Sequence, residues 1–290
     1  MDRKRSTLFH LTLVSASSEA VATAYYKTPY FPPEEQDSRH LDRAREALVR
    51  SETLGSRFME LAGDSPISIN VTIAFDEETL EVVTLGLEGE PMGNPLRFAF
   101  TGSGRRRALD ASAAVGEAIR FVESLPGPDP GPDVDRIWEE TERKLESVRP
   151  LLSEADRHRL GKRMGDLFQA ATEGPSAVTL AHGDLSPGNV ILMEEGIGLI
   201  DFMWIPQLKG FDLSRFIHRL RYTGLSFRPW TNALIEAVID GYGDPDAPSR
   251  PGWRFSELQR LLATIQRLER RGEGGRRSAG RALDEIRTGL

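Results

Sequence analysis

The sequence contains no cysteine and only five histidines in 290 residues. It therefore has no disulfide framework, no thiolate nucleophile and no thiolate metal site. The histidines are scattered, and none is paired at the spacing of metal ligands, which argues against a zinc site. No run approaches the ~18 consecutive apolar residues of a membrane-spanning helix. We therefore expect no membrane partner.

The sequence also lacks an overall positive charge, because its formal net charge is −7. General nucleic-acid binders usually present a basic surface to the phosphate backbone, so we expect no nucleic-acid partner. The charge is unevenly distributed, since residues 251–290 hold nine Arg against five acidic residues. An acidic main body would suit a cationic acceptor, although such an imbalance more commonly serves solubility.

The chain begins MDRKRSTLFHLTLVSAS, a basic start followed by a modest apolar stretch that resembles the opening of a signal peptide. His10 and Thr12 interrupt its leucines, and this mixed pattern favours a β-strand over a continuous apolar signal core. With 39% apolar and 28% charged residues, the composition is typical of a globular protein. We expect a cytoplasmic enzyme or binding protein.

The first 90 residues predict the order β-β-α-β-β. Two β-rich runs, 6–14 and 19–27, flank a polar turn and predict a hairpin. A Pro-free stretch from about 40 to 61 has apolar residues at three- and four-residue steps, which predicts a long helix. Residues 67–73 then alternate between apolar and polar or small side chains, and a second apolar run, 80–87, closes at Gly89.

The remainder is mainly helical in pattern. A helix is predicted over 105–125, where a Pro-rich loop ends it, and a charged helical stretch follows over 134–173. Three short apolar runs come next, at 178–181, 190–193 and 197–200, and the chain from 213 onward is mostly helix with two breaks. We therefore predict an α+β, bilobal fold, with a small β-rich lobe (1–89) and a larger, mostly helical lobe (90–290).

The most informative segment runs from His182 to Asn189, His-Gly-Asp-Leu-Ser-Pro-Gly-Asn, and is followed by Gly-Leu-Ile-Asp-Phe at 198–202. It places Asp184 and Asn189 five residues apart on a Gly- and Pro-containing loop, and Asp201 at the end of an apolar strand. Phosphoryl transfer needs such a set: a carboxylate that accepts the acceptor's proton, and oxygen ligands for Mg²⁺. The same residue types are common in turns, but a plain turn does not require this ordered combination.

This segment resembles the catalytic loop and metal-binding strand of the protein-kinase-like fold, in the His-Gly-Asp form of the aminoglycoside phosphotransferase and choline kinase superfamily. The resemblance implies that Asp184 is the catalytic aspartate and that Asn189 and Asp201 bind the metal. It also implies that His182 supports the loop. Asp212, in the Asp-Leu at the start of the next helix, would steady the loop rather than take part in chemistry.

In the first lobe, Lys27 is the candidate for the family's lysine that contacts the α- and β-phosphates of the nucleotide. A strand-end lysine is more often a solvated edge residue, and the downstream motif is what favours the functional interpretation. Its expected partner is a glutamate on the following helix, where Glu46 and Glu52 compete. Glu52 falls about 40° from Leu48 on the apolar face and Glu46 roughly opposite, so Glu52 is the predicted partner.

One part of the family pattern is missing. Kinases of this fold normally carry another strand and a glycine-rich loop before the lysine, whereas no glycine occurs here before Gly55. Either the chain begins downstream of its natural start, or it grips the nucleotide with fewer contacts. Residues 101–104, Thr-Gly-Ser-Gly, are glycine-rich but follow no strand-to-lysine unit, and we predict a surface loop there.

The predicted activity is transfer of the γ-phosphoryl group of ATP or GTP, with Mg²⁺, to a hydroxyl of a small acceptor. The alternative is a catalytically weak, kinase-like regulatory protein that binds a nucleotide. Such a protein would have no chemical use for all four of Lys27, Asp184, Asn189 and Asp201. A protein kinase fits less well, because residues 202–212 leave little room for an activation segment. The Arg-rich C-terminus argues against an aminoglycoside as the acceptor.

Overall fold

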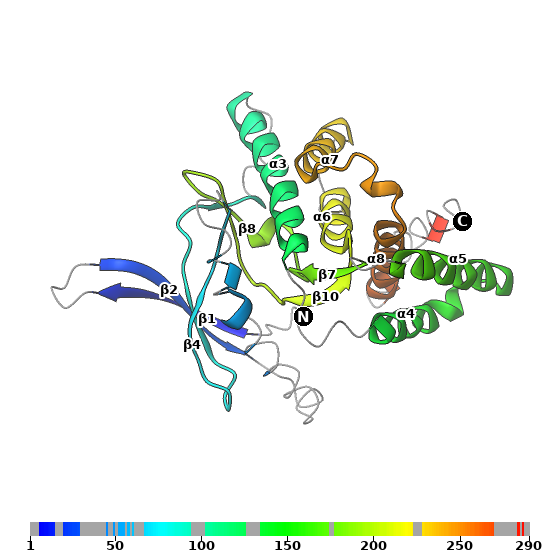
Figure 1. Cartoon of the computed structure of the whole chain (residues 1–290), viewed down its shortest axis with the longest axis horizontal. Coiled ribbons are helices and arrows are strands. Elements are labelled where there is room, and N and C mark those ends of the chain that lie inside the picture. Colours follow the sequence, from blue (N-terminus) through cyan, green and yellow to red (C-terminus); the bar gives the residue numbers. More distant parts are fainter. Residues whose placement is uncertain are drawn as a thin grey trace. The chain divides into compact units, whose positions relative to one another are not determined.

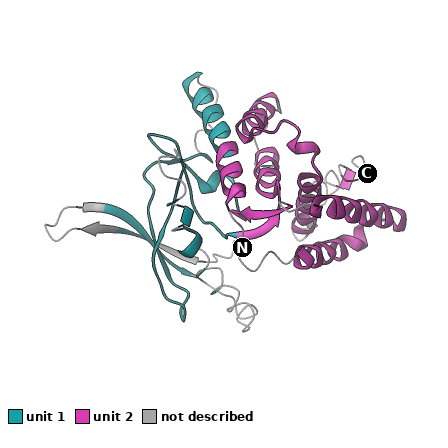
Figure 2. Cartoon of the chain, in the orientation of Figure 1, with its two compact units in different colours: residues 1–115, 184–204 teal, residues 116–183, 205–290 magenta. Residues whose placement is uncertain are grey.

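The computed structural model describes most of the chain: residues 6–14, 20–29, 45, 49, 52–55, 57, 58, 60, 67–93, 102–125, 134–173, 177–222, 228–269, 283, 284 and 286. The chain divides into two compact units (Figure 2). One unit comprises residues 1–115 with 184–204, and the other comprises 116–183 with 205–290. Residues 184–204, which include most of the predicted catalytic loop and the metal-binding strand, fall in the same unit as the N-terminal strands. The lobe boundary at residue 89 stays a prediction.

The first unit contains an antiparallel four-stranded sheet with the order β1-β2-β5-β4. Its strands are β1 (Ser6–Val14), β2 (Ala20–Pro29), β5 (Val82–Leu85) and β4 (Thr72–Phe75), drawn in blue and cyan in Figure 1. The predicted hairpin is confirmed, since β1 pairs with β2 from Ser6 to Val14. Lys27 lies on the inner strand β2, opposite Leu8 on one side and Val82 on the other.

A second sheet of four strands, with the order β3-β9-β8-β6, completes this unit. Its strands are β3 (Ile67–Ile69), β9 (Ile197–Leu199), β8 (Val190–Leu192) and β6 (Glu90–Pro91). Because β3 runs parallel to β9 and β6 pairs with β8, the segment after the catalytic loop is bound into the N-terminal unit by backbone hydrogen bonds. The single strand predicted over 67–73 is wrong, since β3 and β4 belong to different sheets.

The helix predicted over 40–61 is helical at 45, 49, 52–55, 57, 58 and 60, the positions described within it. Leu54 and Phe58, four residues apart, are buried, so this face of the helix packs into the core. The glycine-rich residues 102–104 form the first turn of helix α3 (Gly102–Ser124) rather than a surface loop.

The second unit is mostly helical. Its helices are the end of α3, α4 (Val134–Val148), α5 (Glu154–Thr172), α6 (Phe211–Tyr222), α7 (Arg228–Tyr242) and α8 (Pro251–Glu269). A two-stranded antiparallel ribbon joins β7 (Val178–Ala181) to β10 (Ile205–Leu208), a strand the sequence pattern did not predict. Buried apolar side chains of α4, α5 and α8 form one hydrophobic cluster, which includes Leu160, Met164 and Leu262.

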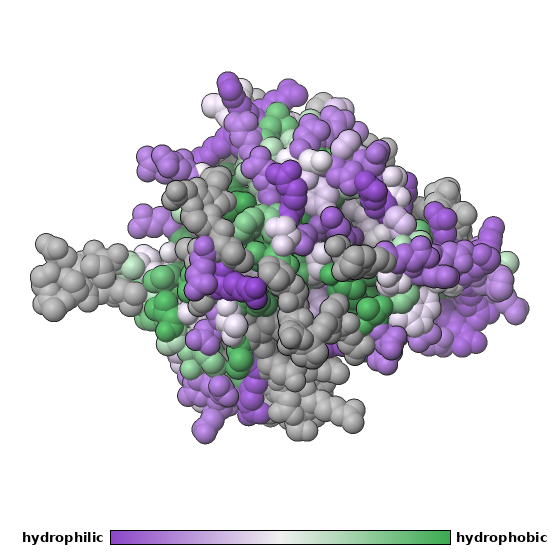
Figure 3. Space-filling view, in the orientation of Figure 1, coloured by the Kyte–Doolittle hydropathy of each residue, from purple (hydrophilic) through white to green (hydrophobic). Residues whose placement is uncertain are grey.

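The stretch predicted as one charged helix over 134–173 is two helices, α4 and α5. A 3-10 turn at Arg149–Leu151 separates them, and Pro150 within it cannot supply the backbone N–H that a continuing helix needs. Ser153 then caps α5 by accepting a hydrogen bond from the backbone N–H of Asp156, at 3.1 Å. The outer faces of α4 and α5 are largely hydrophilic, as Figure 3 shows. Among the described helices, none is long and apolar enough to cross a membrane.

Helix α3 approaches α7 closely at Gly116. We expect Gly116→Ala to lower the free energy of unfolding by on the order of 2–3 kcal/mol, because a Cβ there would meet the carbonyl oxygen of Val238 and the amide nitrogen of Tyr242. Gly161→Ala is the matched control, since a Cβ in that helix interior meets nothing within 4 Å. The control should be unchanged or up to about 1 kcal/mol more stable in urea unfolding. Equal losses in both variants would contradict the close approach.

Candidate active site

The predicted catalytic loop joins β7 to β8 through the 3-10 turn Pro187–Asn189. Gly183 adopts a φ of 89°, in the left-handed region that glycine enters without a steric penalty, and this directs the chain into the loop. Asp184 follows and is half-buried. The Asn189 side-chain nitrogen Nδ2 donates a hydrogen bond of 2.9 Å to the Asp184 carbonyl oxygen. The amide oxygen of Asn189 is therefore the atom that can accept a cation.

Asn189 and Asp201 lie at the same end of the β8–β9 hairpin. Val190 pairs with Leu199, and the backbone N–H of Ile200 donates to the carbonyl oxygen of Asn189 at 3.1 Å. Asp201 leaves the strand with a φ of 60°, a left-handed conformation that Asp tolerates better than most residues. Its side chain is exposed. The hairpin thus brings an amide oxygen and a carboxylate to one edge.

Lys27 reaches this same edge from β2. Its ammonium nitrogen Nζ lies 3.4 Å from the Asp201 carboxylate oxygen Oδ1, although the two residues are 174 positions apart in sequence. The side chains are 40% and 52% exposed, so solvent screens the ion pair. Exposed pairs of this kind typically contribute only about 0–1 kcal/mol, and a ligand can open them at little cost.

Aromatic packing supports the segment that follows Asp201. The ring of Phe202 stacks on Trp204 with centroids 4.3 Å apart. Phe58, fully buried on the N-terminal helix, packs against both rings at 6.2 and 6.1 Å. Trp204 is 1% exposed. The chain after Asp201 is therefore fixed by buried apolar contacts within the first unit.

The predicted partner of Lys27 is not the one that the structure supplies. Glu52 is exposed, because it lies about 200° around the helix from Leu54, whose face packs into the core. Among the described residues no ion pair joins Glu52 to Lys27, and Asp201 takes that place. The competing candidate, Glu46, lies outside the described residues.

In the second unit, Asp212 supports the residues that precede Asp184. Its carboxylate accepts hydrogen bonds from the backbone N–H groups of His182, at 2.5 Å, and Gly183, at 3.1 Å. Asp212 and His182 are each 1% exposed. Burial raises the pKa of the Asp212 carboxyl to about 7, against the lowering effect of the two N–H donors. The carboxylate of Asp212 thus holds the two residues before Asp184, and its supporting role stays a prediction.

A second buried carboxylate, Glu123 on α3, was not singled out from the sequence. It accepts a hydrogen bond from the backbone N–H of Gly210, at 2.7 Å, and another from the Tyr242 hydroxyl, at 2.5 Å. Burial raises the pKa of Glu123. Gly210 precedes α6, so Glu123 fixes the start of the helix that carries Asp212. The available sequence signal was an acidic residue inside the apolar run 118–125.

The oxygen atoms at the hairpin edge fit a hard divalent cation. Asn189 and Asp201 offer one amide oxygen and one carboxylate, and Mg²⁺ usually takes one or two protein carboxylates with phosphates and water completing its shell. Within the described part of the chain, no group of three or more His, Cys, Asp or Glu could hold an ion by itself. The arrangement therefore suits a cation that arrives with a phosphate ligand.

The buried Asp212 predicts a pH dependence of stability. Its folded pKa lies near 7 and the ordinary pKa of an aspartate carboxyl is 3.8, so between about pH 4 and 7 the folded state holds a proton that the unfolded state has lost. Its contribution to stability is present below this window and is lost as the pH rises through it. From pH 5 to 8 the wild type should lose on the order of 2 kcal/mol relative to Asp212→Asn, which does not titrate.

Urea unfolding at both pH values measures this difference. Asp166→Asn, an exposed position on α5 paired with Lys162, is the control, and its offset from the wild type should stay nearly constant. If the free energy of unfolding changes equally in the wild type and in Asp212→Asn between pH 5 and 8, Asp212 does not titrate in this range.

The fold is shared with several solved kinases. An amicoumacin kinase, hAmiN, in complex with AMP-PNP, Ca²⁺ and Ami matches with a TM-score of 0.59 and 14% identity, covering 97% of this chain and 87% of the other. The gentamicin complex of APH(2")-IIa matches at 0.56 and 15%, covering 96% and 90%. A choline/ethanolamine kinase family protein from Mesorhizobium loti matches at 0.57 and 15%, covering 93% and 83%. These similarities confirm the predicted α+β, kinase-like fold.

No curated protein sequence matches the chain significantly. The family model described as "Phosphotransferase enzyme family" matches residues 76–255, more than half of the chain, and this region contains the loop from His182 to Asn189 and the strand that ends at Asp201. The resemblance inferred from the motif is thus confirmed by an independent match. The chain belongs to the phosphotransferase enzyme family.

Proposed function

We propose that this protein is a Mg²⁺-dependent kinase that moves the γ-phosphoryl group of ATP or GTP onto a hydroxyl of a small molecule. The observation that carries the proposal is the convergence of Lys27 and Asp201 at 3.4 Å, beside the Asn189 end of the β8–β9 hairpin. A cation and two oxygen ligands at one edge complement a metal-bound triphosphate, which presents both negative oxygens and a positive ion.

Each residue has a distinct role in the proposed reaction. The Lys27 ammonium binds the α- and β-phosphate oxygens, and Asn189 and Asp201 hold the metal. When bound, Mg²⁺ neutralises the negative charge of the phosphates. Asp184 orients the acceptor hydroxyl and accepts its proton as the oxygen attacks the γ-phosphorus. Asp212 holds the two backbone amides before Asp184, which keeps the loop in place.

The solved structures that share the fold support a nucleotide donor and a small acceptor. The amicoumacin kinase is complexed with AMP-PNP and Ca²⁺, and aminoglycoside phosphotransferases are complexed with GDP, gentamicin or kanamycin. Those ligands belong to proteins that are 14–15% identical to this chain, so they support the class of reaction and not a particular acceptor.

The alternative function is a kinase-like regulatory protein that binds a nucleotide without transferring its phosphate. One observation favours it: Lys27 pairs with Asp201, and among the described residues no helix glutamate pairs with Lys27. An active kinase is expected to pair this lysine with a glutamate of the following helix. A screen of nucleotide consumption over small hydroxylated acceptors, with Mg²⁺ present, separates the two functions. Only the kinase would consume nucleotide in an acceptor-dependent way.

Nucleotide binding should depend on the metal. We expect ATP or GTP to bind at least about tenfold more tightly with Mg²⁺ than with EDTA, because Asn189 and Asp201 contact the triphosphate through the ion. Isothermal titration calorimetry measures both affinities for each nucleotide. Lys27→Ala should weaken binding in the presence of Mg²⁺ without unfolding the protein. Equal affinities in Mg²⁺ and EDTA would remove the metal from the proposal.

Two isosteric substitutions test the separate roles of the aspartates. Asp184→Asn should lower turnover by on the order of 10²–10⁴ and leave nucleotide affinity nearly intact, because Asp184 acts on the acceptor hydroxyl. Asp201→Asn should weaken Mg-nucleotide binding as well as turnover, because Asp201 holds the metal. Steady-state kinetics on an acceptor found in the screen, with calorimetry for binding, measures both effects.

Asp166→Asn serves as the surface control and should match the wild type in both assays. If the wild type turns over an acceptor and Asp184→Asn does so equally fast, the assignment of the catalytic loop is wrong. A wild type that binds nucleotide but consumes none with any acceptor would support the regulatory alternative.

A further inference from the structure

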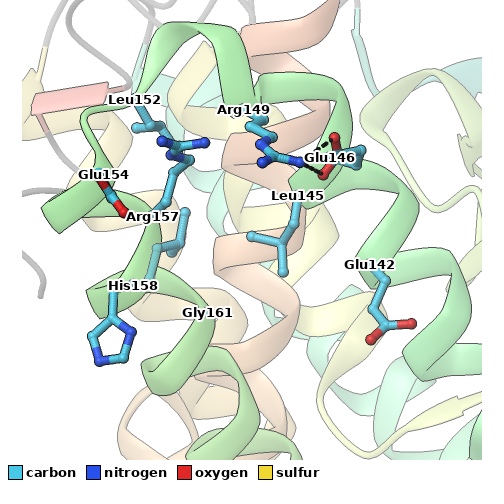
Figure 4. Close-up of a pocket in the computed structure, with 10 residues that line it drawn as sticks. Glu142, Leu145, Glu146, Arg149, Leu152, Glu154, Arg157, His158 and Gly161 are labelled. Atoms are coloured by element: carbon cyan, nitrogen blue, oxygen red, sulfur yellow. Dashed lines mark hydrogen bonds and ion pairs between the residues drawn. The ribbon is translucent and has the colours of Figure 1, made fainter.

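A pocket of about 510 Å³ opens where α4 turns into α5, within the second unit (Figure 4). Its lining comes from the C-terminal half of α4, the 3-10 turn and the first half of α5, and it includes none of the predicted site residues. Its volume falls in the range of small-molecule sites, roughly 300–1,000 Å³. The proposed kinase reaction makes no use of it.

The apolar side of the pocket is formed by three leucines and a glycine. Leu152 and Leu160 belong to the buried core of this unit, and Leu145 packs against that core. Gly161 lies inside α5, where glycine favours the helix less than alanine does. A Cβ at Gly161 would meet nothing within 4 Å, so this glycine faces open space and widens the pocket.

The polar side of the pocket carries two guanidinium groups. Figure 4 shows Arg149 and Arg157 on the same side of the pocket, with Arg149 joined to Glu146. Arg149 is held by Glu146, with its Nη1 at 3.0 and 3.3 Å from the two carboxylate oxygens. The Nε atom of Arg157 is buried and has no hydrogen-bond partner among the described residues. A buried donor left without an acceptor is unfavourable.

The carboxylates around the pocket do not supply that acceptor. Glu154 precedes Arg157 by three residues on α5, and in the described part of the chain no ion pair of 4 Å or less joins them. Glu146 is already engaged by Arg149. Glu142 is exposed and belongs to α4, at the opposite side of the view from Arg157 in Figure 4. Among the described residues no carboxylate forms an ion pair with Arg157, so its guanidinium is the polar group of the lining that can select a ligand.

We propose that this pocket binds a small amphipathic anion, with its carboxylate or phosphate group between Arg157 and Arg149 and its apolar body against Leu145 and Gly161. Arginine presents its N–H groups in a planar fork that matches both oxyanions. A cationic amphiphile could be attracted by Glu142 and Glu154, but it offers no acceptor for the Arg157 donor. The proposal concerns binding only and does not depend on the proposed kinase activity.

Calorimetric titration of the full chain with octanoate, octyl phosphate and octylamine tests the proposal. We expect at least one of the two anions to bind, and the better one identifies the preferred head group, while octylamine should not bind. Arg157→Gln should weaken anion binding by about tenfold or more, because it removes the charged fork. Gly161→Leu should abolish binding by filling the pocket.

Matched controls keep the test decisive. Arg163→Gln removes a charge from an exposed position of α5 outside the pocket lining and should bind as the wild type does. Gly161→Ala adds one methyl group to the open space and favours the helix, so it should remain folded and still weaken binding. The proposal is overturned if neither anion binds at millimolar concentration, if octylamine binds equally well, or if folded Arg157→Gln and Gly161→Ala both bind like the wild type.

Discussion

A buried carboxylate, Asp212, holds the backbone N–H groups of His182 and Gly183, the two residues that lead into Asp184. The backbone of these two residues is therefore held by a buried side chain of α6. Burial of the carboxylate opposes its ionisation, and the two N–H donors offset part of that cost. Glu123 adds a second buried acid that fixes Gly210, just before α6. One buried acid, Asp212, thus connects α6 to the residues before the loop. The other, Glu123, holds the residue before α6.

The first unit assembles its charged edge by strand pairing. Lys27 sits on an inner strand between β1 and β5, and the β8–β9 hairpin places Asn189 beside the residue that precedes Asp201. Backbone hydrogen bonds therefore decide which side chains meet, and the exposed Lys27–Asp201 pair adds little energy of its own. An edge whose charges are fixed by the backbone but weakly paired is suited to exchange its ion pair for a ligand.

In the second unit, α5 combines a buried apolar face with a glycine that lowers its helix propensity. The helix contributes Leu160, Met164 and Leu167 to the buried core, and yet it carries glycine at 161 on its open side. An alanine there would favour the helix and would still fit the available space. Keeping glycine preserves the volume of the pocket beside Arg157, at the expense of helix stability.

The sequence by itself determined the family and the candidate residues of the loop. Asp184, Asn189 and Asp201 could be predicted because phosphoryl transfer restricts residue type and spacing along a short segment. The N-terminal hairpin of β1 and β2 could be predicted because these strands are adjacent in the chain. Both signals are local, and local patterns survive in a single sequence.

The tertiary structure decided the remaining features, because they depend on distances between remote segments. Alternation over 67–73 predicts extended chain but not that its two ends join different sheets. The position of Glu52 on a helical wheel depended on which face packs inward, and Leu54 and Phe58 settled that face. The partner of Lys27 lies 174 residues away, and the role of Glu123 exists only where α3 meets Gly210 and Tyr242. The pattern of residues within one segment does not predict contacts with distant segments.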